Sequence, residues 1–158
     1  MYSEQQFLDA QILLAQLIAC PSFSREEQGT AAIIQDFLHD RNIPFHTLGN
    51  NVWAMNKQFD ANKPSILLNS HHDTVKANSS WTFDPFVATY QDGKMYGLGS
   101  NDAGASLVCL IATFCSFYEQ NLPFNIVLAA TAEEEISGTG GIESVLKSAD
   151  FPQIDWAI

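Results

Sequence analysis

The sequence predicts an α/β fold with three layers, α/β/α, built on a mostly parallel mixed sheet. Two continuous apolar runs, 65–69 and 124–131, have the length expected of strands that are buried on both faces. Segments in which apolar residues recur at helical spacing lie before, between and after these runs. Buried strands that alternate with helices are typical of a parallel sheet that helices cover on both sides.

Two helices are predicted ahead of the first buried strand. Ser3 can cap the first helix, and Pro21 ends it. Residues 24–27 read S-x-x-E, a capping box that predicts the start of the second helix, which Asn42 ends. The apolar face of the first helix is formed by Phe7, Ile12, Leu13, Leu14, Leu17 and Ile18.

Turn residues separate the remaining predicted elements. Asn and Gly at 49–51, and Gln-Asp-Gly at 91–93, favour two hairpins. We expect the hairpin strands at 44–48, 52–56, 86–90 and 94–97. The last predicted elements are a buried helix at 104–120, a short helix at 140–147 and a strand at 154–158.

The composition indicates a globular protein and limits its possible partners. A length of 158 residues fits one domain or part of a larger one, and 46% hydrophobic residues are far too many for a disordered chain. With 18 acidic and 7 basic side chains, the formal net charge is −11. Nucleic acids and anionic membranes are bound through basic surfaces, so this charge argues against both as partners.

Three features favour a cytoplasmic protein. The three cysteines are an odd number without a C-x-x-C pair, which is unlike a disulfide framework. No Lys or Arg precedes Arg25, so the first residues lack the positive start of a secretion signal. The longest uncharged stretch, 103–118, has 16 residues. That is short of the roughly 20 needed to cross a membrane, so we expect a buried helix there.

Titratable side chains cluster directly after three predicted strands. His71, His72 and Asp73 follow the first buried run, and Asp102 follows the second hairpin. Three glutamates at 133–135 follow the second buried run. In an open α/β sheet, ligands bind outside the carboxyl ends of the strands. Taken together, the three clusters predict a site at this edge of the sheet.

Each cluster alone has a simpler interpretation. His-His-Asp is most often a solvated turn, a lone Asp102 in a glycine loop is often a helix cap, and three glutamates are often an exposed charge run. Gly97-x-Gly99 also suggests a dinucleotide fingerprint. The third glycine of G-x-G-x-x-G would then fall on Asp102, an anion where the pyrophosphate should sit.

A bound divalent cation would explain why histidine and acidic side chains cluster at this edge of the sheet. Imidazole and carboxylate groups are costly when they are dry and unpaired, and a cation supplies the missing charge. Imidazole together with carboxylates is a ligand set that suits zinc. In His71-x-Asp73 the aspartate is close enough to accept the proton of the second imidazole nitrogen, which fixes the tautomer. The residues therefore predict a metal site.

Three motifs give the chain a family resemblance. Residues 70–75 read SHHDTV, 97–102 read GLGSND and 133–138 read EEEISG. In this order and spacing they resemble the co-catalytic zinc amidohydrolases. That superfamily contains acetylornithine deacetylase, succinyl-diaminopimelate desuccinylase, aminoacylase and the glutamate carboxypeptidases. The resemblance covers nearly the whole chain, and its wording is most similar to the acetylornithine deacetylase branch.

The resemblance implies roles for five residues. His71 would bind the first of two divalent metal ions, with Asp73 behind it, and Asp102 would bridge both ions. Glu135 would bind the second ion, and Glu134 would be the general base, so that Asp73 and Glu134 form the catalytic pair. The ions are expected to be zinc, with cobalt or manganese as alternatives. The resemblance also implies a cis peptide bond after Asp102.

Other positions carry no expected chemistry. Glu133 precedes the pair of functional glutamates, and His72 lies between the ligand and its supporting aspartate. Leu98 stands where the family often has Arg, and Ala103-Gly104 stand where it often has Met-Lys-Gly. None of the replaced side chains is a metal ligand, so these departures bear on the substrate rather than on the chemistry.

The resemblance further implies that residues 1–158 are the N-terminal part of a catalytic metallohydrolase domain. A further carboxylate ligand, a final histidine ligand and a dimerising lid domain would follow position 158, where a predicted strand reaches the last residue. We expect these residues alone to be inactive and the full-length protein to be a homodimer.

The activity implied by the resemblance is hydrolysis of the amide bond of an N-acyl amino acid, a small-molecule substrate. The acetylornithine deacetylase branch implies N-acetylornithine, on the route to arginine. The alternative within the superfamily is a dipeptidase or carboxypeptidase. The alternative from another class is a non-catalytic domain that binds a divalent ion, and such a domain has no need of Glu134.

Overall fold

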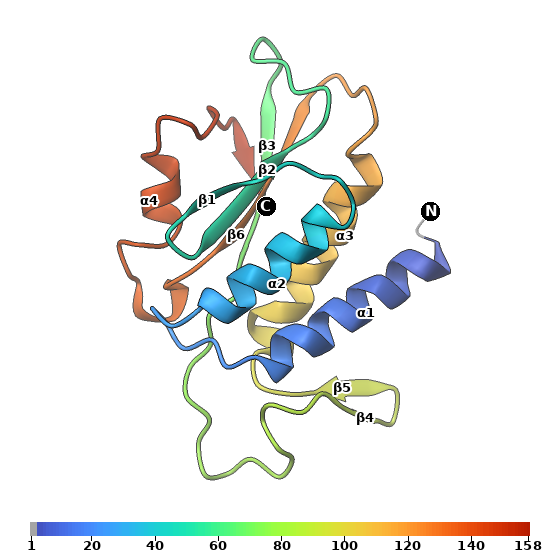
Figure 1. The fold of residues 1–158 in the computed structure, drawn as a ribbon, viewed down its shortest axis with the longest axis vertical. Helices are drawn as coiled ribbons and strands as arrows, with labels where there is room; N and C mark the ends of the chain where they lie inside the picture. The colour runs from blue at the N-terminus through green and yellow to red at the C-terminus, as the bar shows by residue number, and fades with distance from the viewer. Residues whose placement is uncertain (1–2) are drawn as a thin grey trace.

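The computed structural model describes residues 3–158 and places them in a five-stranded mixed sheet, four α-helices and a two-stranded hairpin (Figure 1). The helices are α1 (Glu4–Ala19), α2 (Gln28–His39), α3 (Ala105–Phe117) and α4 (Ile142–Leu146). The strands are β1 (His46–Leu48), β2 (Asn51–Met55), β3 (Ser65–His71), β4 (Thr89–Gln91), β5 (Lys94–Tyr96), β6 (Asn125–Thr131) and β7 (Trp156–Ala157). A turn, Ser100–Gly104, in which Asp102 and Ala103 have non-helical backbone angles, precedes α3, and a 3₁₀ turn, Glu134–Ile136, follows β6.

The strand order of the sheet is β1-β2-β6-β3-β7. β6, β3 and β7 are parallel, whereas β2 runs antiparallel to β6 and β1 runs antiparallel to β2. β3 and β6 pair along their whole length, from Ser65 opposite Asn125 to His71 opposite Thr131. Their carboxyl ends therefore lie side by side at one edge of the sheet.

Helices cover both faces of the sheet, which confirms the predicted three-layer α/β/α fold. α1, α2 and α3 pack on one face, and α4 packs on the other, as Figure 1 shows. Neighbouring residues of β3 point into different cores: Leu68 packs under the three helices, and Leu67 packs with Val145 of α4. This two-sided burial explains why the strand is a continuous apolar run.

The predicted capping box at 24–27 is wrong. α2 begins directly after Glu27, which makes no side-chain capping bond. The Ser24 hydroxyl instead donates to Asp73 Oδ2 over 2.7 Å. The Glu27 carboxylate is fully buried and accepts the Glu133 backbone N–H over 3.2 Å. Ser24 therefore binds the loop after β3, and Glu27 binds the loop after β6.

Some predicted boundaries shift by a few residues. α2 ends at His39 rather than at Asn42, whose positive φ of 54° is incompatible with a continuing helix. The strand predicted at 154–158 is β7, and backbone hydrogen bonds of Asp155 and Ile158 extend its pairing with β3.

The predicted buried helix, α3, is apolar and buries one of its sides. With the preceding turn it forms the one stretch of the described residues, Ser100–Phe117, whose length and composition would suit a membrane crossing. Leu107, Ile111 and Phe114 are buried in the larger core, while Phe117 is 37% exposed. The helix therefore packs one face against the sheet, as helices of an α/β fold do.

The burial of α3 predicts unequal effects of two substitutions. Phe114→Ala removes a ring with 0% exposure and should lower the free energy of unfolding by about 3–5 kcal/mol. Phe117→Ala, on the exposed side of the same helix, should cost about 1 kcal/mol or less. Urea unfolding of the two variants measures the difference. Equal losses would contradict the packing of α3 against the sheet.

Candidate active site

Three segments carry the side chains of the predicted site. His71 is the last residue of β3, and the glutamates at 133–135 follow the neighbouring strand β6. Asp102 lies in the turn before α3. Because β3 and β6 are parallel neighbours, the segments that follow them start from the same edge of the sheet.

The side chains of His71, Asp102 and Glu135 converge at this edge. One nitrogen of the histidine and one oxygen of each acid lie within 4.8 Å of one another. His71 Nε2 is 3.1 Å from Asp102 Oδ1 and 3.7 Å from Glu134 Oε2. Ligand bonds of about 2.0–2.2 Å place two ligands of one zinc ion within roughly 4.4 Å of each other. The spacing of the three groups is therefore close to that of ligands around divalent ions, and their roles as ligands stay predictions.

Asp73 lies behind His71 and is fully buried. Its Oδ1 is 3.3 Å from His71 Nδ1. The carboxylate also accepts the Ser24 hydroxyl at 2.7 Å and the backbone N–H groups of Glu134 and Glu135 at 3.1 Å each. Burial alone would raise the pKa of Asp73, but the bonds from His71, Ser24 and the two N–H groups lower it to about 2. Asp73 therefore stays ionised and orients the imidazole.

His71 is a stronger base than a free imidazole when it binds no metal. Burial lowers its pKa, but the hydrogen bond and charge of Asp73, helped by Glu134, raise it to about 9. A histidine that binds a metal must have lost one proton, so a divalent cation at Nε2 would replace the proton there. A proton or a cation can thus balance the same negative charges.

Glu135 shows the effect of gathered carboxylates. Burial and the nearby charge of Asp102 raise the pKa of the Glu135 carboxyl, against the opposing effect of His71. A carboxylate whose ionisation is opposed by another carboxylate is stabilised by a cation between the two. Both the negative charge of the site and its imidazole and carboxylate donors therefore suit a divalent cation.

Gly99 and a cis peptide bond shape the turn that presents Asp102. Gly99 has a φ of 72°, and a Cβ at this position would lie 2.5 Å from Thr74 Cγ2, so a larger residue does not fit. The Gly104 N–H donates to the Gly99 carbonyl over 2.8 Å and closes the turn. The peptide bond between Asp102 and Ala103 is cis, as the resemblance implies.

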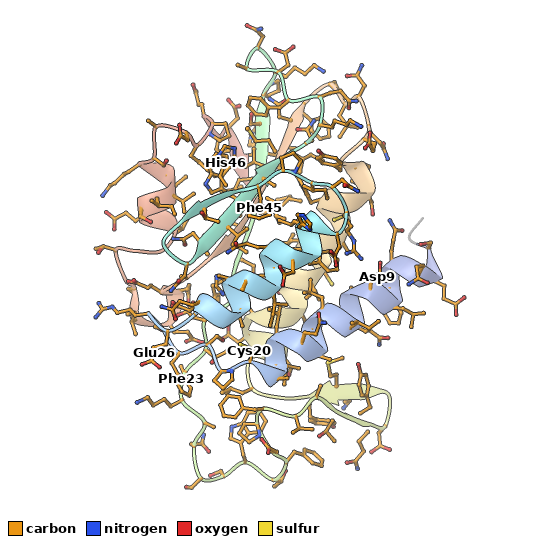
Figure 2. All side chains as sticks on the ribbon, in the orientation of Figure 1. Asp9, Cys20, Phe23, Glu26, Phe45 and His46 are labelled. Atoms are coloured by element: carbon orange, nitrogen blue, oxygen red, sulfur yellow. The ribbon has the colours of Figure 1, made fainter. Side chains whose placement is uncertain are left out.

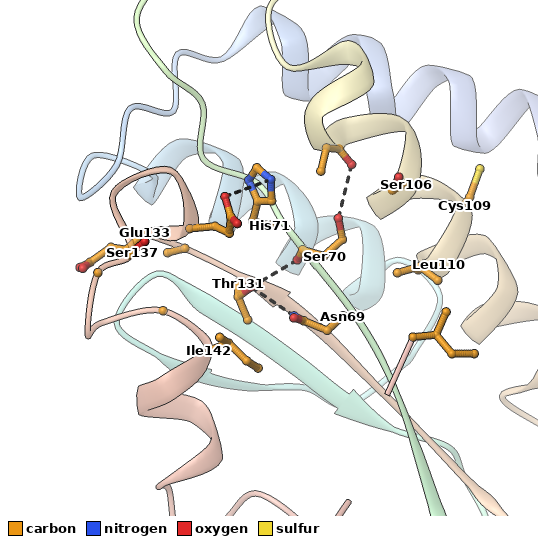
Figure 3. A pocket seen from close by; sticks show the side chains of 16 residues that line it. Asn69, Ser70, His71, Ser106, Cys109, Leu110, Thr131, Glu133, Ser137 and Ile142 are labelled. Atoms are coloured by element: carbon orange, nitrogen blue, oxygen red, sulfur yellow. Dashed lines mark hydrogen bonds and ion pairs between the residues drawn. The ribbon is translucent and has the colours of Figure 1, made fainter. Parts of the chain in front are cut away.

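A cleft of about 750 Å³ opens beside His71 (Figure 3), and Asp102 and Glu135 are not among the residues that line it. His71, Glu133 and Glu134 contribute its titratable groups, and Asn69 of β3 contributes an amide. Leu110 of α3 and Ile142 of α4 add apolar wall. An open cleft with a few polar groups and an apolar wall is the usual form of a small-molecule site.

His72 is not part of the converging group. Its ring is buried, with Nδ1 2.8 Å from the Thr30 hydroxyl and Nε2 3.0 Å from the Asn50 carbonyl. Burial lowers the pKa of His72, which favours the neutral ring. The His72 imidazole therefore links α2, through Thr30, to the turn at Asn50, and it does not face the cleft.

Sequence reasoning missed two residues that contact the site from behind. Ser24 donates to Asp73, and Glu27 accepts the Glu133 backbone N–H, so both contact residues that adjoin the predicted ligands and base. The S-x-x-E pattern marked these residues, but it favoured a helix cap. Glu133, to which no chemistry was assigned, belongs to the same contacts.

Comparison with known proteins places the chain in a family. Residues 67–158 match the family model described as Peptidase family M20/M25/M40. The chain belongs to this family. It is 29% identical to succinyl-diaminopimelate desuccinylase of Delftia acidovorans, over 92% of this chain and 42% of that protein. It is 31% identical to the protein of the same name from Rhodospirillum centenum, over 85% of this chain and 37% of that protein.

The M20/M25/M40 chain spans about two fifths of the length of these curated relatives. Among solved structures, human carnosine dipeptidase 1 has a TM-score of 0.72 and 23% identity, over 98% of this chain and 39% of its own. A Bacillus subtilis protein described as a dinuclear metal binding peptidase from the M20 family has a TM-score of 0.73 and 17% identity, over 99% and 43%. At these identities the similarity shows the fold alone.

The opposite pKa shifts of His71 and Asp73 predict the pH dependence of stability in metal-free protein. The pKa of His71 rises from 6.5 to about 9 on folding, so its contribution is complete below about pH 6.5 and is lost as the pH rises through 9. The pKa of Asp73 falls from 3.8 to about 2, so its contribution is complete above about pH 4 and is lost as the pH falls through 2. Urea unfolding in the presence of a chelator should show greatest stability between about pH 4 and 6.5.

His71→Gln provides the control for this profile. The variant has no titrating imidazole at the site, so its stability should fall much less between about pH 6.5 and 9 than that of the parent protein. The same fall in both proteins would contradict the assignment of the alkaline limb to His71.

Proposed function

We propose that the full-length protein is a metal-dependent hydrolase that cleaves the amide bond of an N-acyl amino acid. The observation that carries this proposal is the convergence of His71, Asp102 and Glu135, beside a Glu134 side chain that is 61% exposed at the cleft. Membership of the M20/M25/M40 peptidases supports it. In the proposal, His71 and Asp102 hold one ion, Asp102 and Glu135 hold a second, and zinc is the metal, with cobalt or manganese as alternatives.

Two adjacent glutamates divide the work in this proposal. Divalent ions held at the site would polarise the scissile carbonyl and lower the pKa of a water molecule toward about 7. Glu134 would take a proton from the water as its oxygen adds to the acyl carbon, and would give that proton to the amine nitrogen as the C–N bond breaks, because its carboxylate lines the cleft beside His71. Asp73 keeps the imidazole in place from behind and holds the backbone of both glutamates.

The acyl group is the finer part of the proposal. The two curated relatives described above are named succinyl-diaminopimelate desuccinylases. Their name supports N-succinyl amino acids as the first substrates to consider for this protein. The expectation of N-acetylornithine, and of a role in arginine biosynthesis, finds no support in these two relatives. Dipeptides remain the alternative substrate class within the family.

The remaining features of the proposal concern partners and location. The net charge of −11 supports a small-molecule substrate rather than nucleic acid or an anionic membrane. Homodimerisation of the full-length protein and a cytoplasmic location stay predictions, as does the assignment of residues 1–158 to the N-terminal part of the catalytic domain.

Assays of the full-length protein on three amides test the proposed function. Zinc-loaded protein should hydrolyse N-succinyl-diaminopimelate faster than N-acetylornithine or an unmodified dipeptide. Treatment with a chelator should abolish the activity, and added zinc should restore it. Preferred cleavage of the dipeptide would favour the peptidase alternative, and metal-loaded protein that cleaves none of the three would contradict the proposal.

Substitutions of the two glutamates separate the proposed base from the proposed ligand. Glu134→Gln should keep both ions and lower kcat by about 10²–10⁴-fold, the usual contribution of a general base. Glu135→Gln should lose bound metal as well as activity, as metal analysis would show. Glu143→Gln, at an exposed position of α4, serves as the control. Normal turnover in Glu134→Gln would contradict the assignment of Glu134 as the general base.

A further inference from the structure

Two buried carboxylates lie beneath the turn that carries the proposed base and ligand. Three consecutive backbone N–H groups, of Glu133, Glu134 and Glu135, each donate to a carboxylate oxygen. Asp73 accepts the last two, and Glu27 accepts the first at 3.2 Å. Both acceptors have 0% exposure. The Glu27 carboxylate therefore continues the row of acceptors that Asp73 begins.

Hydrogen-bond donors rather than a cation surround Glu27. The carboxylate accepts the Arg25 backbone N–H at 2.7 Å, the Asn50 side-chain amide at 2.6 Å and the Glu133 backbone N–H at 3.2 Å. Within the described part of the chain no ion pair includes Glu27, and the Arg25 guanidinium lies 3.8 Å from the Glu133 carboxylate instead. A buried carboxylate is costly unless such donors satisfy it. The Glu27 carboxylate consequently holds these three N–H donors in place.

The turn needs this support because its backbone is irregular. Glu133 has a φ of 57°, in the left-handed region that residues other than glycine seldom adopt. The following loop wraps closely around the Glu133 side chain: a Cβ at Gly138 or Gly140 would lie 2.0 or 2.4 Å from its carboxylate oxygens. A displacement of Glu133 would consequently move Glu134 and Glu135, the next residues in the chain.

We propose that Glu27 is a positioning residue of the hydrolytic site. Through the Glu133 N–H, its buried carboxylate fixes the turn that directs Glu134 toward the water and Glu135 toward the metal. This inference rests on the proposed function and concerns how the site is held in place. A displacement of about 1 Å at a reacting group can cost about 10²-fold in rate. Loss of the Glu27 acceptor therefore acts on kcat, while KM changes little because the cleft walls of β3 and α3 stay in place.

The kinetic test compares Glu27→Ala and Glu27→Gln with Glu26→Ala in the full-length protein. Glu26 is the neighbouring acid, and it projects from the surface (Figure 2), so its loss controls for charge. Glu27→Ala should lower kcat about 10²-fold with KM within about threefold of the parent value. Glu27→Gln keeps one acceptor oxygen for the turn and should recover about tenfold of this loss. Glu26→Ala should match the parent protein.

Hydrogen exchange of the metal-free protein gives a readout that does not depend on turnover. In Glu27→Ala the amides of 133–135 should exchange at least about tenfold faster, while those of β6 keep their protection. Asn50→Ala removes one donor from the Glu27 carboxylate at a half-buried position, and it should show smaller changes in the same direction. If Glu27→Ala does not fold, kcat and hydrogen exchange of Asn50→Ala decide whether Glu27 positions the turn.

Two outcomes would overturn the positioning role. One is that kcat and exchange in every folded variant of Glu27 and Asn50 equal those of Glu26→Ala. The other is a lower Tm in these variants with kcat unchanged well below that temperature, because Glu27 would then be merely structural. Failure of the proposed function looks different: the parent protein would cleave no amide, or Glu134→Gln would be as active as the parent.

Discussion

The buried carboxylate of Asp73 is the group on which the rest of the site depends. Its partners are the His71 ring at 3.3 Å, the Ser24 hydroxyl at 2.7 Å and the backbone N–H groups of Glu134 and Glu135. They come from the end of β3, the segment before α2 and the turn after β6, which are far apart in the sequence. Because the pKa of Asp73 is about 2, one permanent charge orients the imidazole and also anchors both glutamates.

The strands and the convergence of the site could be predicted because they follow from local patterns and one geometric rule. Leu67 and Leu68 point into different cores, so β3 is apolar at successive positions and is recognisable from its sequence alone. Parallel neighbouring strands end at the same edge of a sheet. That rule brings His71 toward the glutamates at 133–135 without knowledge of the loops. Asp102 was placed with them because it follows a predicted hairpin strand, and the resemblance to zinc amidohydrolases supplied its role.

The supports behind the site could not be predicted, because they are contacts between distant segments. Ser24 is 49 positions from Asp73, and Glu27 is 106 positions from Glu133. Within the segment 24–27 itself, S-x-x-E has the pattern of a helix start, and nothing local distinguishes a capping carboxylate from one that will be buried under another loop. The fold overrides the local preference because it offers Glu27 three N–H donors in a dry environment.

The site consequently has a buried half and an exposed half. The side chains of His71 and Asp73 are 9% and 0% exposed, whereas those of Asp102 and Glu134 are 78% and 61% exposed. A buried anion must be satisfied by donors that the fold provides, so the protein itself fixes the position of the first pair. The exposed acids are solvated, so they need no such donors and can adjust to a cation that arrives later. A chain with a net charge of −11 can gather carboxylates at one edge of the sheet in this way. The carboxylates that the fold holds in place, Asp73 and Glu27, are those that accept backbone N–H groups.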